Sequence, residues 1–215
     1  MPTTADGEAA FLERDYQKAM EIWQPLAEEG DAEAEAWLGS LFANGLGADR
    51  DMVRAFDLYL RAAQKGNALA ANNVGAMYAK GEGVATDPVK AASWFRQAAE
   101  QGDALGQFNY AVLLTKGQGV DVDMAQAVQW YRRAAVGGHY PSQARLGYCY
   151  ARGLGTPVDR VEAFVWLSAA AQHGVGLAMA ELEELVRAMS ADEKRSGSRR
   201  LAERLGARVE AASPA

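Results

Sequence analysis

The stretch Tyr78–Phe95, YAKGEGVATDPVKAASWF, decides how this chain of 215 residues folds. Its Gly81-Glu82-Gly83 segment looks like the beginning of a phosphate-binding loop. Such a loop is usually used once, at the start of one helix. Here the same Gly-x-Gly pattern recurs at intervals of 36 residues, at Gly45-Leu46-Gly47, Gly117-Gln118-Gly119 and Gly153-Leu154-Gly155. Four copies at a constant spacing indicate that these glycines shape the chain and do not hold a ligand.

The residues that flank the glycines repeat with the same period. An aspartate, an alanine, a large apolar residue, a pair of alanines and a closing glycine each recur four times. The aspartates are Asp51, Asp87, Asp123 and Asp159, and the closing glycines are Gly66, Gly102, Gly138 and Gly174. Four full units therefore cover residues 32–67, 68–103, 104–139 and 140–175. A period of this length is typical of repeat architectures.

Each unit is predicted to form two helices. In the unit 68–103, apolar residues at helical spacing place the first helix at about Leu69–Lys80, and Gly81 ends it. Asp87-Pro88 begins the second helix as a capping residue followed by proline at the first helical position. Glycine inside a helix costs about 1 kcal/mol relative to alanine. We therefore expect close contact with a bulky Trp or Tyr at the mid-helix glycines, which are Gly39, Gly75 and Gly147.

This pattern resembles the Sel1-like repeat family, a relative of the tetratricopeptide repeat. In the second full unit the matching motifs are Val74-Gly75-x-x-Tyr78, Gly81-x-Gly83-Val84, Ala91-x-x-Trp94-Phe95 and Ala98-Ala99-x-x-Gly102. The resemblance covers residues 32–175 at full strength. It implies an all-α fold, a right-handed superhelical solenoid of helix-pair repeats, in which the first helices line the concave surface.

The two ends of the chain depart from the repeat. Residues 1–31 lack the Gly-x-Gly loop and are expected to form a tetratricopeptide-like capping helix pair. Residues 32–175 are the four repeats, and residues 176–205 are a partial repeat followed by a capping helix. Ser190 and Glu193 have the spacing of a capping box, so this helix should begin at Ala191 and run to about Arg204. Residues 206–215 are expected to form a flexible tail.

Composition and charge exclude several classes of function. A formal net charge of -6 argues against broad nucleic-acid or membrane binding. The single cysteine, Cys149, excludes an intrachain disulfide framework and a thiolate-rich metal site, and no cofactor or metal is expected. The opening MPTTADGEAA has neither a basic start nor an apolar core of a signal peptide. We expect a cytoplasmic protein, or a periplasmic one if a leader has been removed.

The expected function is that of a non-catalytic adaptor or scaffold. Solenoids of this kind mostly bind peptides or proteins across the concave face. Asparagine can both donate to and accept from a peptide backbone, and Lys and Arg favour carboxylates. The hypothesis is a groove for an acidic or C-terminal peptide segment, anchored by Trp37 and Tyr148. The candidate residues are Trp37, Asn44, Asn73, Lys80, Asn109, Lys116, Arg145, Tyr148 and Arg152.

Two alternatives to this groove stay open at this point. Cations in the last turn of a helix are favoured by its dipole by about 0.3–1 kcal/mol, which alone can place Lys80, Lys116 and Arg152. The terminal helices can instead carry head-to-tail self-association, with a basic C-terminal face (Arg199, Arg200, Arg204 and Arg208 beside Leu201, Leu205 and Val209) meeting an acidic N-terminal region (Glu28, Glu29, Asp31, Glu33 and Glu35). We expect a monomer or a weak homo-oligomer.

An enzyme is the least favoured class. His139 and His173 are the only histidines, and neither stands in a recognisable constellation with Cys149 and a carboxylate. Cys149 is expected to pack as a small hydrophobic residue. Some cysteine-rich members of the resembled family are associated with β-lactam binding or hydrolysis. The paired cysteines of those members are missing here, so that activity does not carry over.

Overall fold

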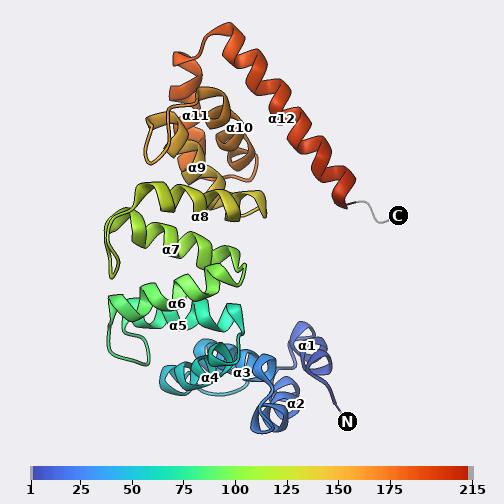
Figure 1. Ribbon diagram of the computed structural model, residues 1–215. Helices are drawn as coiled ribbons and strands as arrows, with labels where there is room; N and C mark the ends of the chain where they lie inside the picture. The colour runs from blue at the N-terminus through green and yellow to red at the C-terminus, as the bar shows by residue number, and fades with distance from the viewer. Residues whose placement is uncertain (1, 213–215) are drawn as a thin grey trace. The chain divides into compact units, whose positions relative to one another are not determined.

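The computed structural model describes the backbone of residues 2–212 and the side chains of residues 2–204. This part of the chain is all-α and contains no strand (Figure 1). The helices are α1 (Thr4–Leu12), α2 (Tyr16–Glu28), α3 (Ala32–Asn44), α4 (Met52–Gln64), α5 (Ala68–Lys80), α6 (Pro88–Glu100), α7 (Ala104–Lys116), α8 (Met124–Val136), α9 (Tyr140–Arg152), α10 (Arg160–Ala171), α11 (Gly176–Ala188) and α12 (Ala191–Ala212). The predicted helix-pair fold is confirmed.

The chain divides into two compact units. One consists of Met1–Leu113 with Gly117–Asp121, and the other of Leu114–Lys116 with Val122–Ala215. In the first unit α3 packs on α4 and α5 packs on α6, and in the second α9 packs on α10. The core of the first unit is built from small residues between larger ones, with Trp23, Leu41 and Val74 fully buried among alanines.

Each loop between paired helices closes in the same way. The aspartate at the start of the second helix accepts a hydrogen bond from a backbone N–H of the first turn, as Asp51 does from Arg54. Its own backbone N–H donates to a carbonyl in the last turn of the first helix. This second bond is 3.0 Å long in all four repeats, from Asp51, Asp87, Asp123 and Asp159 to Phe42, Tyr78, Leu114 and Tyr150. The same aspartate therefore caps the second helix with its side chain and closes the loop with its backbone N–H.

The second glycine of each Gly-x-Gly loop presses against the helix pair that precedes it. A Cβ atom on Gly83 would lie 2.1 Å from the carbonyl oxygen of Met52, the first residue of α4. The same clash with the first residue of the preceding second helix occurs at Gly47, Gly119 and Gly155, against Tyr16, Pro88 and Met124. Both loop glycines also have positive φ, +75° at Gly81 and +71° at Gly83. The loop is thus filled by the protein's own backbone, in agreement with the structural role predicted from its four copies.

The mid-helix glycines are contact points within a helix pair. A Cβ on Gly39 would lie 3.0 Å from the Tyr59 ring, and one on Gly75 would lie 2.8 Å from the Phe95 ring. At Gly147 the neighbour is Leu167. The expected close contact is confirmed, and at Gly39 the partner is a Tyr as expected. At Gly75 and Gly147 the partner is Phe95 or Leu167 and not the Trp that precedes it.

The N-terminal pair α1–α2 has the short turn that was expected in place of the glycine loop. Thr3 and Asp6 form a capping box before α1. Arg14 adopts a left-handed conformation with φ of 64°, and Asp15 caps α2. Trp23 closes the pair by donating from Nε1 to the carbonyl of Thr4 at 3.0 Å.

The C-terminal helix is longer than predicted. Ser190 and Glu193 form the expected capping box, but α12 continues past Arg204 to Ala212. It packs on α10, where Gly197 lies against Phe164 and the Arg204 guanidinium lies 3.9 Å from the centre of the Trp166 ring. The predicted flexibility of residues 206–215 stays a prediction, and residues 213–215 lie outside the described part of the chain.

The loop contact makes a direct prediction for Gly83→Ala. Alanine at this position is strained by the positive φ and also collides with the backbone of Met52. Gly102→Ala is the matched control, because Gly102 has φ of +93° but a Cβ at that position would meet no atom within 4 Å. Overpacking costs about 1–3 kcal/mol. Gly83→Ala should therefore unfold at a clearly lower urea concentration than Gly102→Ala, as followed by circular dichroism. Equal midpoints would contradict the contact.

Candidate functional site

A cleft of about 450 Å³ lies along the first helices of the first three repeats, and we call it the first-helix cleft. Its walls come from α3 and α5, from the start of α7, and from Tyr59 of α4. All of these residues belong to the first compact unit. The lining residues are Glu33, Ala36, Trp37, Ser40, Asn44, Tyr59, Asn67, Leu69, Asn72, Asn73, Asp103 and Leu105.

Three of the predicted groove residues, Trp37, Asn44 and Asn73, line this cleft together. Asn44 is exposed and donates from Nδ2 to the Ser40 carbonyl at 2.8 Å, so part of its hydrogen-bonding capacity is used within its own helix. Asn109 does not line the cleft, and its Nδ2 donates to Oδ1 of the buried Asn72 at 2.9 Å. That bond ties α7 to α5. Asn73 lies half-buried on the cleft wall.

Two aromatic residues, Trp37 and Tyr59, line the cleft. Trp37 stacks on Trp23, with ring centres 5.1 Å apart and planes 7° apart, and lies 5.2 Å from the ring of Phe11. Its Nε1 donates to Glu8 Oε1 at 3.3 Å. Tyr59 is buried beside the cleft, and this burial raises the pKa of its hydroxyl despite a hydrogen bond with Ser40. The Trp37 ring is therefore held in a fixed orientation before any partner arrives.

Two exposed leucines and two carboxylates complete the walls. Leu69 and Leu105 occupy equivalent positions 36 residues apart, and their exposed fractions are 57% and 46%. Glu33 lies in the first turn of α3, and Asp103 is the capping residue of α7. Among the lining residues these two are the charged ones, and both are acidic. The cleft thus combines exposed apolar side chains, amides and negative charge.

The predicted cations do not meet in this cleft. Lys80 belongs to the first unit, ends α5 and lies 3.9 Å from Glu82, whereas Lys116 and Arg152 belong to the second unit. Arg152 already binds two carboxylates of α11, Glu181 at 3.1 Å and Glu184 at 2.7 Å. The hydrogen bond from Arg152 to Glu181 is the largest cause that raises the pKa of Arg152.

The remaining predicted residues of the second unit lie on α7 and α9. The ring of Tyr148 stands 5.8 Å from the Arg152 guanidinium, and Arg145 is exposed. Lys116 is exposed at the end of α7. The structure thus gathers three of the nine predicted residues into one cleft and gives Arg152 a structural role between α9 and α11.

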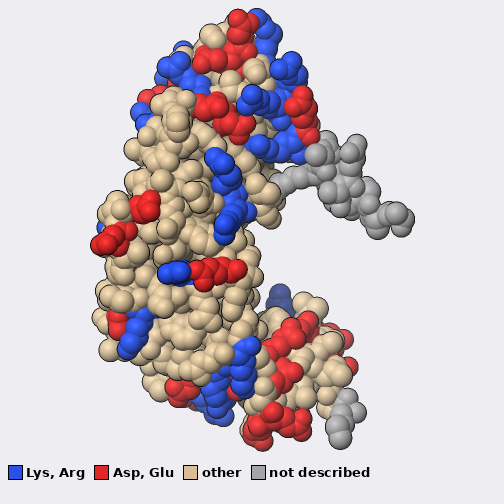
Figure 2. Space-filling view, viewed as in Figure 1, with Lys and Arg blue, Asp and Glu red and all other residues tan. Residues whose placement is uncertain are grey.

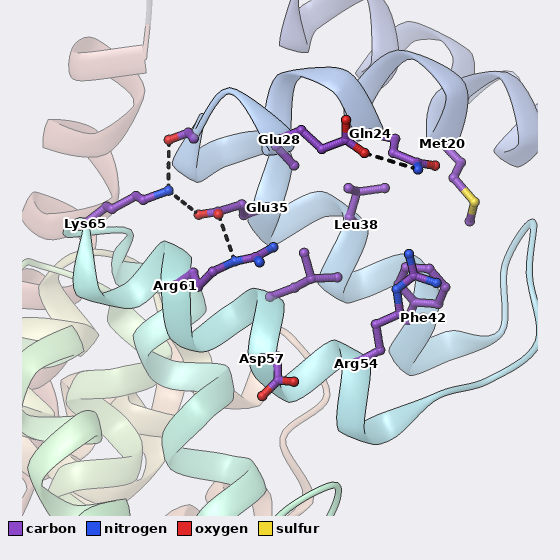
Figure 3. Close-up of a pocket in the computed structure, with 13 residues that line it drawn as sticks. Met20, Gln24, Glu28, Glu35, Leu38, Phe42, Arg54, Asp57, Arg61 and Lys65 are labelled. Carbon is purple, nitrogen blue, oxygen red and sulfur yellow. Dashed lines mark hydrogen bonds and ion pairs between the residues drawn. The ribbon is translucent and has the colours of Figure 1, made fainter.

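A second cleft, of about 630 Å³, lies on the second helices of the first unit, and we call it the second-helix cleft (Figure 3). It is bounded by α2, α3 and α4, and Leu38 and Phe42 supply apolar surface. The Arg54 guanidinium lies 4.2 Å from the centre of the Phe42 ring. Acidic and basic residues both line it, so it has no single charge; the charged ones are Glu28, Glu35, Arg54, Asp57, Arg61 and Lys65.

Glu35 is the unusual residue of the second-helix cleft, because it is only 2% exposed. Oε1 lies 3.0 Å from Arg61 Nε and Oε2 lies 2.8 Å from Lys65 Nζ. Lys65 also donates to the Gly30 carbonyl at 2.9 Å. The buried charge is therefore paired through both oxygens and fastens α4 to α3, while Lys65 also reaches the turn that precedes α3.

The sequence contained a signal for some of the missed residues. Position 35 is followed at intervals of 36 by Ala71, Gln107 and Gln143, so a charged residue there breaks the repeat. Leu69 and Leu105 repeat at the interval but were hidden among the apolar residues of their helices. The exposure of those two side chains follows from the packing of neighbouring repeats, which periodicity within one helix does not reveal.

The residues considered for catalysis are placed in packing roles. Cys149 is 3% exposed, which confirms that it packs in the core. His139 Nδ1 lies 2.8 Å from Ser142 Oγ at the start of α9, and His173 stacks on Tyr140 with ring centres 3.5 Å apart. Within residues 2–204, no group of three His, Cys, Asp or Glu side chains is arranged to hold a metal ion. None of the described helices has the length and apolar character needed to cross a membrane.

The Sel1 repeat model matches residues 5–31, 32–67, 68–103, 104–139 and 141–175. The first of these matches shows that the helix pair without a glycine loop is itself similar to the repeat. Comparison with curated proteins finds no match.

Solved structures show the same similarity. The crystal structure of a Sel1 repeat protein from Oxalobacter formigenes is 31% identical, with a TM-score of 0.78 over 85% of this chain and 75% of that one. The structure of c5321, a protective antigen of uropathogenic Escherichia coli with an SLR fold, is 23% identical, with a TM-score of 0.61 over 98% of this chain and 56% of that one. The second similarity is one of fold.

The pairing of Glu35 predicts an asymmetric response to substitution. The variant Arg61→Met/Lys65→Met leaves the buried carboxylate without a cation, which should lower the free energy of unfolding by about 3 kcal/mol. Adding Glu35→Gln to that variant removes the charge and should restore most of the loss, as measured by urea denaturation. If the triple variant is less stable than the double variant, the cations do not serve to compensate Glu35.

Burial also predicts the reactivity of Cys149. It raises the pKa of the thiol to about 11, so the group stays protonated, and unreactive as a nucleophile, until the pH approaches that value. At pH 8 the native protein should react with a disulfide reagent at a small fraction of the rate seen in roughly 8 M urea, where the chain is unfolded. Rapid native labelling at pH 8 would contradict this placement.

Proposed function

From the premise that this chain belongs to the Sel1 repeat family, we propose that it is a non-catalytic adaptor whose first-helix cleft binds an extended peptide segment of a partner protein. Sel1 repeat proteins generally mediate protein–protein interaction. Repeat solenoids bind such segments along the surfaces that their repeats present. Membership of the family supports protein binding as the class of function, and the first-helix cleft supports the proposed location of the binding site.

One observation carries the proposal. Trp37, Asn73 and the exposed Leu69 lie in one cleft although they come from two repeats. A peptide that binds there buries apolar side chains on the leucines and the tryptophan, while the amides of Asn73 and Asn44 can pair with its backbone. Because the Trp37 ring is already fixed by Trp23 and Glu8, little conformational freedom is lost there on binding.

The acidic segment expected from the sequence has weaker support than the cleft itself. That expectation depends on Lys80, Lys116 and Arg152. Arg152 pairs with two glutamates of its own chain, and its replacement would disturb the α9–α11 packing whatever the partner. We therefore keep the peptide and the cleft in the proposal and leave out the acidic character.

Self-association through the terminal helices is the second candidate, and it stays a prediction. Two arginines of the basic face of α12 already form ion pairs within the chain. Arg200 and Arg204 lie 3.1 and 3.6 Å from the carboxylate of Glu162. Leu205, Arg208 and Val209 have side chains outside the described part. Among the described residues, no observation favours this candidate over the cleft.

The variant Leu69→Glu tests the proposal. A probe is first obtained by selecting peptides from a displayed random library on the wild-type protein. The substitution removes an apolar contact and introduces a carboxylate that loses its hydration when an apolar side chain of the peptide covers it. This cost exceeds what an exposed ion pair with the peptide returns. Binding of the selected peptides should therefore weaken by roughly tenfold or more in fluorescence anisotropy.

The control is Val89→Glu. Val89 is 65% exposed, and it occupies the second position of α6 just as Leu69 occupies the second position of α5. The two substitutions therefore introduce the same charge at the same place relative to a helix dipole. Peptides whose binding responds to Val89→Glu and not to Leu69→Glu would refute the first-helix cleft as the site.

A further inference from the structure

We infer that the peptide segment bound in the first-helix cleft is cationic, with a Lys or Arg next to an apolar side chain. This inference depends on the proposed function of the cleft and names the chemistry of its partner. It reverses the sign of charge that the sequence pattern suggested.

The charge of the cleft wall is the first argument. Glu33 and Asp103 are the charged lining residues of the first-helix cleft, and the nearby Glu8 accepts a hydrogen bond from Trp37. Figure 2 shows further Asp and Glu side chains over the part of the molecule where Figure 1 places α1 and α2. A wall of one sign favours a partner of the opposite sign and raises its rate of association.

The carboxylate of Asp103 keeps capacity for a ligand. As the capping residue of α7 it accepts a hydrogen bond from the backbone N–H of Gly106. A carboxylate has about four lone-pair sites, so a cap occupies only part of them. Glu33 is exposed in the first turn of α3 and lines the cleft. Both groups can therefore accept from a guanidinium or ammonium group placed in the cleft.

Helix electrostatics give a competing reason for acidic residues at these positions. Carboxylates near the start of a helix are stabilised by the dipole by about 0.3–1 kcal/mol. The chain itself shows that capping does not require the charge, because Asn67 stands 36 residues before Asp103 and caps α5 in the same way. A negative charge at position 103 is thus additional to the structural need.

The Trp37 ring is the second, independent argument. It lines the cleft while its stacking on Trp23 fixes its plane. Tryptophan attracts cations over its ring face more strongly than tyrosine or phenylalanine does. A Lys or Arg side chain in the cleft can therefore contact the indole and a carboxylate at once, whereas an Asp or Glu would be repelled by both.

The positions of Leu69 and Leu105 determine how far apart the apolar side chains of the bound peptide should be. Leu69 and Leu105 lie on α5 and α7, which the bond between Asn72 and Asn109 holds side by side. Neighbouring helix axes are about 8–10 Å apart, and an extended chain rises about 3.3 Å per residue. A peptide with two apolar side chains about two or three residues apart can therefore place one on Leu69 and the other on Leu105. Its Lys or Arg then lies beside them, toward Glu33 or Asp103.

The experiment combines selection with a charge-removal variant. Peptides are selected from a displayed random library on wild-type protein, and the most frequent one is measured beside a version in which each Lys and Arg is replaced by Glu. The protein variant is Glu33→Gln/Asp103→Asn, in which asparagine preserves the cap as Asn67 does. We expect selected peptides enriched in Lys and Arg, and a roughly 2- to 30-fold weaker affinity for the variant, the range of two partly exposed ion pairs. The charge-reversed peptide should bind the wild-type protein more weakly still.

The matched control removes two negative charges from the other cleft. Glu28→Gln/Asp57→Asn leaves the first-helix cleft unchanged but alters the net charge by the same amount. Its affinity for the selected peptide should stay within about twofold of wild type, the low end expected for an exposed ion pair. An equal loss in both variants would mean a non-specific attraction to an acidic protein, and would overturn the inference.

Two further outcomes separate this inference from the proposed function. If binding responds to Leu69→Glu but the peptides carry no cationic bias and bind the Glu33→Gln/Asp103→Asn variant normally, the cleft binds peptides and the cationic inference is wrong. If no selected peptide responds to Leu69→Glu, the proposed function fails, and the inference fails with it. A selection that returns acidic peptides would overturn the inference directly.

Discussion

The close approach of each glycine loop to the helix pair before it is the constraint on which the rest of the structure depends. A side chain at Gly83 cannot coexist with the backbone of Met52 at its present position. The same contact recurs at each loop, so the loop fixes the distance between neighbouring repeats. Once that distance is set, the capping aspartates and the mid-helix glycines can bring the two helices of each pair together in the same way every time.

The outward faces of the helices are then free to differ between repeats, and the first-helix cleft is formed where three such faces lie next to each other. Glu33 and Asp103 can therefore give the cleft wall its negative charge without altering the fold.

The sequence was sufficient to place the helices of the 68–103 repeat, because the signals that begin and end them are local. A glycine that ends α5 and an aspartate-proline pair that begins α6 act within a few residues of themselves. The partner of Gly75 was less predictable, because Trp94 and Phe95 are adjacent and only the rotation of α6 decides that Phe95 makes the contact. The full length of α12 was also missed. The Ser196-Gly197-Ser198 stretch weakens the local helix signal, and the contact of Gly197 with Phe164 of α10 cannot be read from that local pattern.

The candidate site was predictable only in part, for a similar reason. The helical period correctly placed Trp37, Asn44 and Asn73 on a shared surface. It did not reveal that Asn109 donates a hydrogen bond to Asn72, or that Arg152 donates one to Glu181. Those acceptors lie about a full repeat away in the sequence. Charge in a row of equivalent positions is therefore weaker evidence for a binding site than a cleft whose lining residues are known.

The most direct measurement is photo-crosslinking of a selected peptide from one residue in each cleft. A photoreactive benzophenone amino acid replaces the exposed Asn44 in the first-helix cleft, or the exposed Gln24 in the second-helix cleft, and the crosslinked product is identified by mass spectrometry. If the peptide binds in the first-helix cleft, position 44 should give a crosslink that unlabelled peptide competes away, and position 24 should give none above background. A competed crosslink from position 24 alone would contradict binding in the first-helix cleft and would place the partner on the second helices.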